Sequence, residues 1–236
     1  MNLFNYFLKL SVKLSAFVTG SVLVLLMNSS VVNAEILYDQ SAVDGDGFLA
    51  NSVFVEPIAD DFTVASDSSL ESISWAGFYT DSSGGYASST DVASFTDNFT
   101  VRILTDDGGS PSSLGSAGET ILSGSLTRSA TSSSSIYQDD IYTYDFVLDS
   151  AFSLSASETY YFSVIGSSLD YDWYWATNSY DTGTSWDALG TNWNSSQSDM
   201  AFSMSGTATN VPEASSFILF AIMLPLLLVA RRRKIK

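Results

Sequence analysis

The segment FTVRIL, residues 99–104, carries the pattern that decides the fold class of this chain. Its apolar side chains alternate with Thr100 and Arg102, and a period of two places successive side chains on opposite faces of a β-strand. We therefore expect the apolar row to face a core and Arg102 to face water. The neighbouring segments decide whether this strand belongs to an all-β domain.

Strand signals recur along the chain and are separated by turns rich in Gly, Ser and Asp. Residues 106–111, DDGGSP, predict a turn, and the Ser/Thr-rich residues 129–135 predict a mobile loop or an edge segment. Gly77 is expected to mark a bulge or bend. The pattern predicts an all-β fold, a β-sandwich or jelly roll. The further strand candidates are residues 36–38, 60–64, 70–79, 120–126, 141–148, 159–165 and 200–204.

The N-terminal residues predict a signal peptide. Lys9 and Lys13 are followed by a mostly apolar stretch, residues 14–27, and then by the small-residue site Val32-Asn33-Ala34. We expect cleavage between Ala34 and Glu35, so that the mature chain begins at Glu35. An uncleaved membrane anchor is the alternative interpretation.

The C-terminal residues have three parts in a fixed order. A short polar motif precedes an apolar span, residues 214–230, and a basic cluster follows it. As a helix the span is roughly 25 Å long at about 1.5 Å per residue, barely enough for a bilayer core of about 30 Å. A basic flank marks the cytoplasmic side, which favours this interpretation over a buried helix of the domain. The motif is Val211, Pro212, Glu213 and Ala214, and the cluster is Arg231, Arg232, Arg233 and Lys234.

This tripartite tail resembles the PEP-CTERM sorting signal, whose usual core is Pro-Glu-Pro where this chain has Ala214 in the third position. The strand pattern also looks like the all-β ectodomain common among PEP-CTERM proteins. The resemblance implies that the chain comes from a Gram-negative bacterium and that two partners process it, signal peptidase and an exosortase. It implies an intermediate anchored in the inner membrane by its C-terminal helix, and then release to the cell surface or the extracellular exopolysaccharide.

Composition limits what the body of the protein can do. Residues 35–210 hold two of the nine Lys and Arg and 25 of the 26 Asp and Glu, a formal charge of −23. Such a surface repels nucleic acid and favours cations such as Ca²⁺. Because the chain has neither Cys nor His, disulfides, thiolate nucleophiles, His/Cys zinc sites and Ser-His-Asp triads are excluded.

Four of the five tryptophans lie close together in the sequence and allow two interpretations. Aromatic faces stack on sugar rings, so these residues are candidates for carbohydrate contact. Packing in a sandwich core is the favoured alternative, since residues 171, 173 and 175 would share one face of a strand. The four are Trp173, Trp175, Trp186 and Trp193.

Two carboxylate hypotheses remain. Asp44 and Asp46 are the best candidates for a Ca²⁺ ligand pair, although Ca²⁺ needs six to eight oxygens and solvated turn residues are the alternative. A carboxylate glycosidase would need two paired acids. The five glutamates of the body show no such signature, and surface positions are favoured for them: Glu35, Glu56, Glu71, Glu119 and Glu158.

The sequence thus predicts three parts: a signal peptide, residues 1–34, a β-sandwich ectodomain, residues 35–210, and a sorting signal, residues 211–236. We expect a non-enzymatic surface protein that needs no cofactor and associates with extracellular matrix or exopolysaccharide. The alternative is a carbohydrate-binding module or lectin, and a glycosidase is disfavoured.

Overall fold

The computed structural model describes residues 34–51, 57–81, 92, 96–136, 139–167, 171–179, 183–189, 192–196 and 198–209. The chain divides into two units, residues 1–33 and 34–236, and all described residues belong to the second. The predicted sorting motif, residues 211–214, the apolar span and the basic cluster lie outside the described residues, as do residues 1–33 of the predicted signal peptide. Among the described residues, no helix is long and apolar enough to cross a membrane.

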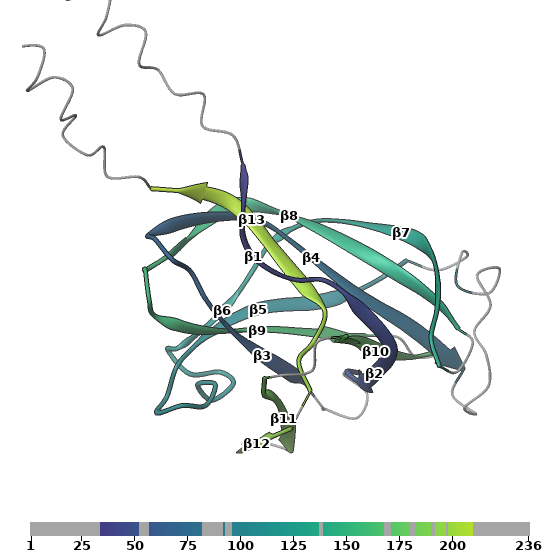
Figure 1. Ribbon diagram of the computed structural model, residues 1–236. Helices are drawn as coiled ribbons and strands as arrows, with labels where there is room; N and C mark the ends of the chain where they lie inside the picture. Colours follow the sequence, from purple (N-terminus) through teal and green to yellow (C-terminus); the bar gives the residue numbers. More distant parts are fainter. Residues whose placement is uncertain are drawn as a thin grey trace, which may run out of the picture. The chain divides into compact units, whose positions relative to one another are not determined.

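The described residues form thirteen β-strands, which confirms the all-β prediction (Figure 1). Their bounds are β1 Glu35–Gln40, β2 Val43–Leu49, β3 Ile58–Thr63, β4 Ser68–Asp81, β5 Phe99–Thr105, β6 Glu119–Ile121, β7 Gly124–Ser134, β8 Asp140–Leu154, β9 Thr159–Gly166, β10 Tyr171–Asn178, β11 Ser185–Leu189, β12 Asn192–Ser195 and β13 Phe202–Ala208.

The strands make two antiparallel sheets. In the seven-stranded sheet, β4 pairs with β8 along one edge and with β13 and β10 along the other, while β1, β2 and β7 lie outermost. The six-stranded sheet has the order β12-β11-β3-β9-β5-β6. In Figure 1, β4, β8 and β13 lie over β3, β5 and β9. The arrangement is sandwich-like, and both sheets bury their facing sides.

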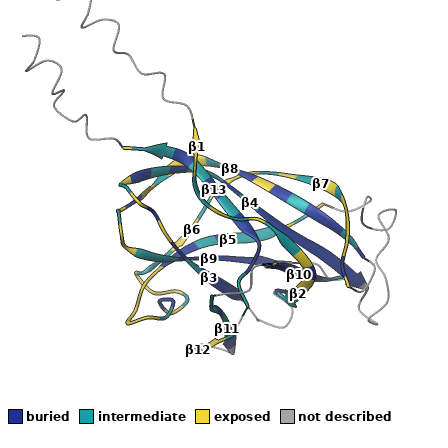
Figure 2. Cartoon of the chain, in the orientation of Figure 1, coloured by how far each residue is buried: buried dark blue, intermediate teal, exposed yellow. Residues whose placement is uncertain are grey.

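Large aromatic side chains fill the space between the sheets. The inner tryptophans Trp75, Trp173 and Trp175 have at most 1% of their surface exposed. Phe162 of the six-stranded sheet lies with its ring centroid 5.9 Å from that of Trp75 and 5.1 Å from that of Trp175. Figure 2 shows β4 and β9 as mainly buried, whereas β7 carries long exposed segments. The two sheets therefore share one aromatic core.

Several local expectations need correction. Arg102 does not face water, because its side chain is only 11% exposed and pairs with Glu119. Gly77 makes no bulge: it lies inside β4, where a Cβ would approach Trp173 Cζ2 to 2.6 Å. For the Ser/Thr-rich stretch, the edge-segment alternative holds, because residues 129–134 form the end of the edge strand β7. Asp44 and Asp46 lie within strand β2 and not in a turn.

Candidate functional site

The predicted sugar-contact residues separate into two groups. Trp173 and Trp175 of β10 have no exposed surface, so their prediction as carbohydrate contacts is wrong and the alternative, core packing, holds. Trp186 of β11 and Trp193 of β12 are partly buried and lie in a different apolar cluster, over Ala59, Leu104 and Tyr161. Strand alternation explains the division, because these residues lie on the outer face of the six-stranded sheet.

Contacts on that outer face fix the outer tryptophans. The Tyr161 ring lies 6.4 Å from that of Trp186 at an interplanar angle of 88°, and its hydroxyl donates to Asp106 Oδ1 at 3.0 Å. Trp193 Nε1 donates to the Ser112 carbonyl at 3.1 Å. Loop residues 106–118 are thereby held against the β11–β12 hairpin. The loop can turn back sharply because Gly108 and Gly109 adopt positive φ angles of 73° and 91°.

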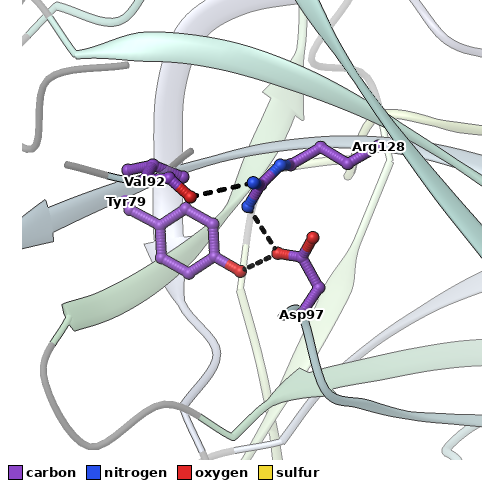
Figure 3. Close-up of polar contacts among 4 residues, drawn as sticks. All are labelled: Tyr79, Val92, Asp97 and Arg128. Atoms are coloured by element: carbon purple, nitrogen blue, oxygen red, sulfur yellow. Dashed lines mark hydrogen bonds and ion pairs between the residues drawn. The ribbon is translucent and has the colours of Figure 1, made fainter. Parts of the chain in front are cut away.

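A second polar cluster lies at the end of β4, and Figure 3 shows it. Arg128 of β7 pairs with Asp97 at 2.9 Å and donates to the Val92 carbonyl at 2.9 Å. The Tyr79 hydroxyl donates to the same Asp97 oxygen at 2.5 Å. Arg128 also lies over the Tyr142 ring, 5.1 Å from its centroid. This cluster ties the segment before β5 to the edge strand β7.

The two arginines of the body are therefore both in ion pairs. Arg102 Nε lies 3.1 Å from Glu119 Oε1, although the orientation is not that of a hydrogen bond. Burial lowers the pKa of Arg102, and Glu119 offsets part of this effect. Because residues 35–210 contain no other Lys or Arg, the body has little to offer an anionic ligand.

A third cluster surrounds the buried carboxylate of Asp60 on β3. Asp60 is 1% exposed, and its Oδ2 accepts hydrogen bonds from Gln40 Nε2 and Met200 N, both at 2.6 Å. Its Oδ1 accepts from Asp61 N at 2.9 Å. Burial raises the pKa of Asp60 well above its usual value; Asp199 and Asp61 add to this, whereas the Met200 and Gln40 donors oppose it.

A pocket of about 390 Å³ lies beside this cluster and is lined by residues that include Tyr38, Gln40, Asn178 and Asp199. The Gln40 amide is occupied within the protein, since Nε2 also donates to the Met200 carbonyl and Oε1 accepts from Tyr38. Asn178 Nδ2 likewise donates to the Gln40 carbonyl. The lining therefore offers carboxylates to a ligand more readily than amide groups, which favours cations over anions.

The Ca²⁺ hypothesis stays a prediction. Asp44 Oδ1 accepts from Asp46 N at 2.9 Å and from Thr177 Oγ1 at 2.6 Å, so one of its oxygens already has two donors. Asp46 Oδ1 accepts from Gly47 N. Within the described part of the chain, no group of three or more Asp or Glu is placed to hold a metal ion. Two carboxylates alone supply fewer oxygens than Ca²⁺ requires.

The predicted acid residues of a glycosidase are scattered. Glu35, Glu71 and Glu158 are exposed on three different strands or turns, Glu119 pairs with Arg102, and Glu56 lies outside the described residues. The sequence reasoning missed Asp60, which has the most perturbed environment among the described carboxylates. A signal was present, because Asp60 stands between Ile58 and Phe62 in a row that faces the core.

Comparisons with protein families, with curated proteins and with solved structures find no match to this chain.

Proposed function

We propose that this chain is an exported, surface-sorted protein without catalytic activity, processed by signal peptidase and an exosortase. After processing, its acidic β-body associates with extracellular matrix or exopolysaccharide at the surface of a Gram-negative cell. The resemblance of residues 211–236 to a PEP-CTERM signal is the basis of this proposal. The C-terminal span anchors the precursor in the inner membrane until the tail is processed.

The positions at which the strands begin and end support the proposal. Strand β1 begins at Glu35, the residue after the expected cleavage site, and β13 ends at Ala208, three residues before the sorting motif. Thr209 still donates to the Asp67 carbonyl, from its backbone nitrogen at 2.7 Å and from its hydroxyl at 2.6 Å. Removal of both ends would therefore leave every described strand complete.

The pairing of the first and last strands adds to this support. β1 and β13 are antiparallel neighbours, and Glu35 is paired with Gly206. The start of β1 and the end of β13 therefore lie at the same end of the seven-stranded sheet. A precursor with membrane segments at both termini can keep both in one bilayer with this arrangement.

We also propose that the body is a sandwich of the jelly-roll type. The chain passes repeatedly from one sheet to the other: β3 lies in the six-stranded sheet, β4 in the seven-stranded sheet and β5 again in the six-stranded sheet. The same alternation recurs from β8 to β9 and from β9 to β10. Such crossings between two antiparallel sheets are typical of Greek-key and jelly-roll connections.

The test is a double substitution, Pro212→Ala with Glu213→Ala, in the cells that produce the protein. The expected result is a precursor that keeps its tail and stays in the membrane fraction, detected by mass spectrometry and fractionation. Ser215→Ala, just beyond the motif, is the matched control and should be processed normally. Release of the double variant at the wild-type rate would contradict the proposal.

A further inference from the structure

The β11–β12 hairpin presents two tryptophans on one face. In the register of the hairpin, Trp186 is paired with Ser195 and Ala188 with Trp193. Paired residues share a face and side chains alternate along a strand, so Trp186 and Trp193 lie diagonally on the same face. Only the small, buried Ala188 stands beside Trp186 on this face of β11. The two indoles therefore form one surface.

The underside of this surface is packed, while Trp186 and Trp193 both remain partly exposed. Tyr161 and Leu104 are buried beneath the pair, and Leu114 of loop 106–118 packs beside it. The Trp193 hydrogen bond to Ser112 and the perpendicular packing of Trp186 on Tyr161 hold the rings in place. We call Tyr161, Trp186 and Trp193 the aromatic platform. Its rings are fixed before any ligand arrives, which lowers the entropic cost of binding.

A hydrogen-bond acceptor lies beside the platform. Asp106 is exposed, and its Oδ1 accepts from both Tyr161 OH and Gly109 N at 3.0 Å. Among the described residues no donor reaches Asp106 Oδ2, so this oxygen can accept a hydrogen bond from a ligand hydroxyl. Indole faces that contact apolar C–H groups, next to a carboxylate that accepts hydroxyl donors, match the two kinds of surface of a pyranose ring.

We propose that the aromatic platform binds an uncharged polysaccharide. The charge of the site selects for neutral sugars: Asp61 and Asp106 lie on the same sheet face, and Arg102, the cation of that face, is paired with Glu119. An anionic polymer would meet carboxylates without a compensating cation. This inference rests on the proposed function, which places exopolysaccharide around the protein. It adds that the protein binds the neutral fraction of that polysaccharide.

The experiment uses the full-length chain in a polyoxyethylene detergent, because sugar-based detergents would compete for the site. The probe is the exopolysaccharide of the producing cells, divided by anion exchange into a neutral and an acidic fraction. Isothermal titration gives the affinity for each fraction. The variants are Trp186→Ala, Trp193→Ala and Trp186→Phe. The control is Ile36→Ala, which removes a side chain that is 66% exposed on β1 of the other sheet.

The platform predicts binding of the neutral fraction and at least tenfold weaker binding of the acidic fraction. Each Trp→Ala change should weaken binding about tenfold, as expected for a central aromatic contact. Trp186→Phe should keep most of the affinity because a ring remains, and Ile36→Ala should change nothing. Binding of neither fraction, or equal binding by both Trp→Ala variants and wild type, would overturn the inference.

A second measurement on the wild-type protein removes any dependence on how well the variants fold. Acrylamide quenches the fluorescence of exposed tryptophans, which should be Trp186 and Trp193 because the inner tryptophans are already shielded. Saturating neutral polysaccharide should cover these two residues and so reduce the quenching. Unchanged quenching at saturation would also overturn the inference.

The inference and the proposed function can fail separately. A protein that is trimmed and released as proposed but does not bind neutral polysaccharide contradicts the inference alone. A protein that binds it yet keeps its tail in the cell envelope contradicts the proposed function alone.

Discussion

The inner tryptophans, Trp75, Trp173 and Trp175, and the outer pair, Trp186 and Trp193, place the same residue type in two environments. The inner three lie between the sheets, at most 1% exposed, and contact phenylalanines of the opposite sheet or their own. The outer pair lies on an edge hairpin of the six-stranded sheet and is partly exposed. The sheet face on which an aromatic side chain lies, more than the residue type, decides whether it stabilises the fold or remains available to a ligand.

The largest expected effect comes from truncating an inner tryptophan. Trp175→Ala should lower the free energy of unfolding by about 3–5 kcal/mol, because it removes buried contacts and leaves a cavity. Trp175 packs against Phe162 and Phe202 and donates from Nε1 to the Ala201 carbonyl at 3.1 Å. Urea denaturation followed by circular dichroism measures the change. A loss below about 1 kcal/mol would show that the inner tryptophans do not form the core.

A somewhat smaller loss is expected from Asp60→Ala. The change leaves three donors, Gln40 Nε2, Met200 N and Asp61 N, without their acceptor in a buried place. Unsatisfied buried donors cost about 1–3 kcal/mol each before relaxation, so we expect a total near 3 kcal/mol. The exposed Asp145→Ala on β8 is the control and should stay within about 0.5 kcal/mol of wild type. Equal stability of the two variants would contradict the account of Asp60.

Buried tyrosines should also make the free energy of unfolding fall at alkaline pH. Burial raises the pKa of Tyr79, and burial likewise raises the pKa of Tyr144. A tyrosine whose pKa is higher in the folded than in the unfolded state contributes to stability. This contribution is complete at pH values below the pKa of an unfolded tyrosine, about 10. This stability is lost as the pH rises further, by about 1.4 kcal/mol per pH unit for each tyrosine. Denaturation at pH 9, 10 and 11 should show this decline.

Tyr144→Phe sharpens that measurement. The Tyr144 hydroxyl is buried and makes no hydrogen bond of ordinary geometry with a described residue, so the change should cost little at neutral pH. The variant should lose stability less steeply above pH 10 than wild type, since one buried hydroxyl no longer titrates. Parallel curves for the two proteins would count against a role for Tyr144 in the alkaline transition.

Among the tryptophans, the smaller effect on stability is expected at the outer pair. Trp186→Ala should lower the free energy of unfolding by only about 1–2 kcal/mol, because Trp186 is partly exposed and packs over a small cluster. Acrylamide quenching should divide the five tryptophans into two accessible and three shielded ones, and Trp186→Ala should remove accessible emission. If Trp186→Ala removes shielded emission instead, or costs as much as Trp175→Ala, the distinction between the two groups fails.

Strand alternation predicted the elements with clear apolar rows, and it failed where turn-forming residues occupy a strand. β5 and β9 match the expected residues 99–104 and 159–165 to within one residue. The pattern missed β2 because Asp44-Gly45-Asp46-Gly47 has the composition of a turn, although the strand that contains these residues pairs with β10. β11 and β12 were missed as strands because they are only five and four residues long.

The candidate sites depend on pairings that are distant in sequence. Asp60 and Met200 are 140 residues apart and Asp97 and Arg128 are 31 apart, so no local pattern could bring either pair together. The sequence identified Trp186 and Trp193 as candidates but could not separate them from Trp173 and Trp175. That separation depends on the sheet face, because Trp173 and Trp175 lie in the core between the sheets, whereas Trp186 and Trp193 lie on the outer face of the six-stranded sheet.

Intact-mass analysis of the protein recovered from the surface of the producing cells tests the central claim most directly. The account predicts a chain that begins at Glu35 and has lost the basic cluster, residues 231–236, so that the strands from β1 to β13 remain complete. Recovery of the whole chain of 236 residues, with its N-terminal methionine and its basic tail, would contradict it.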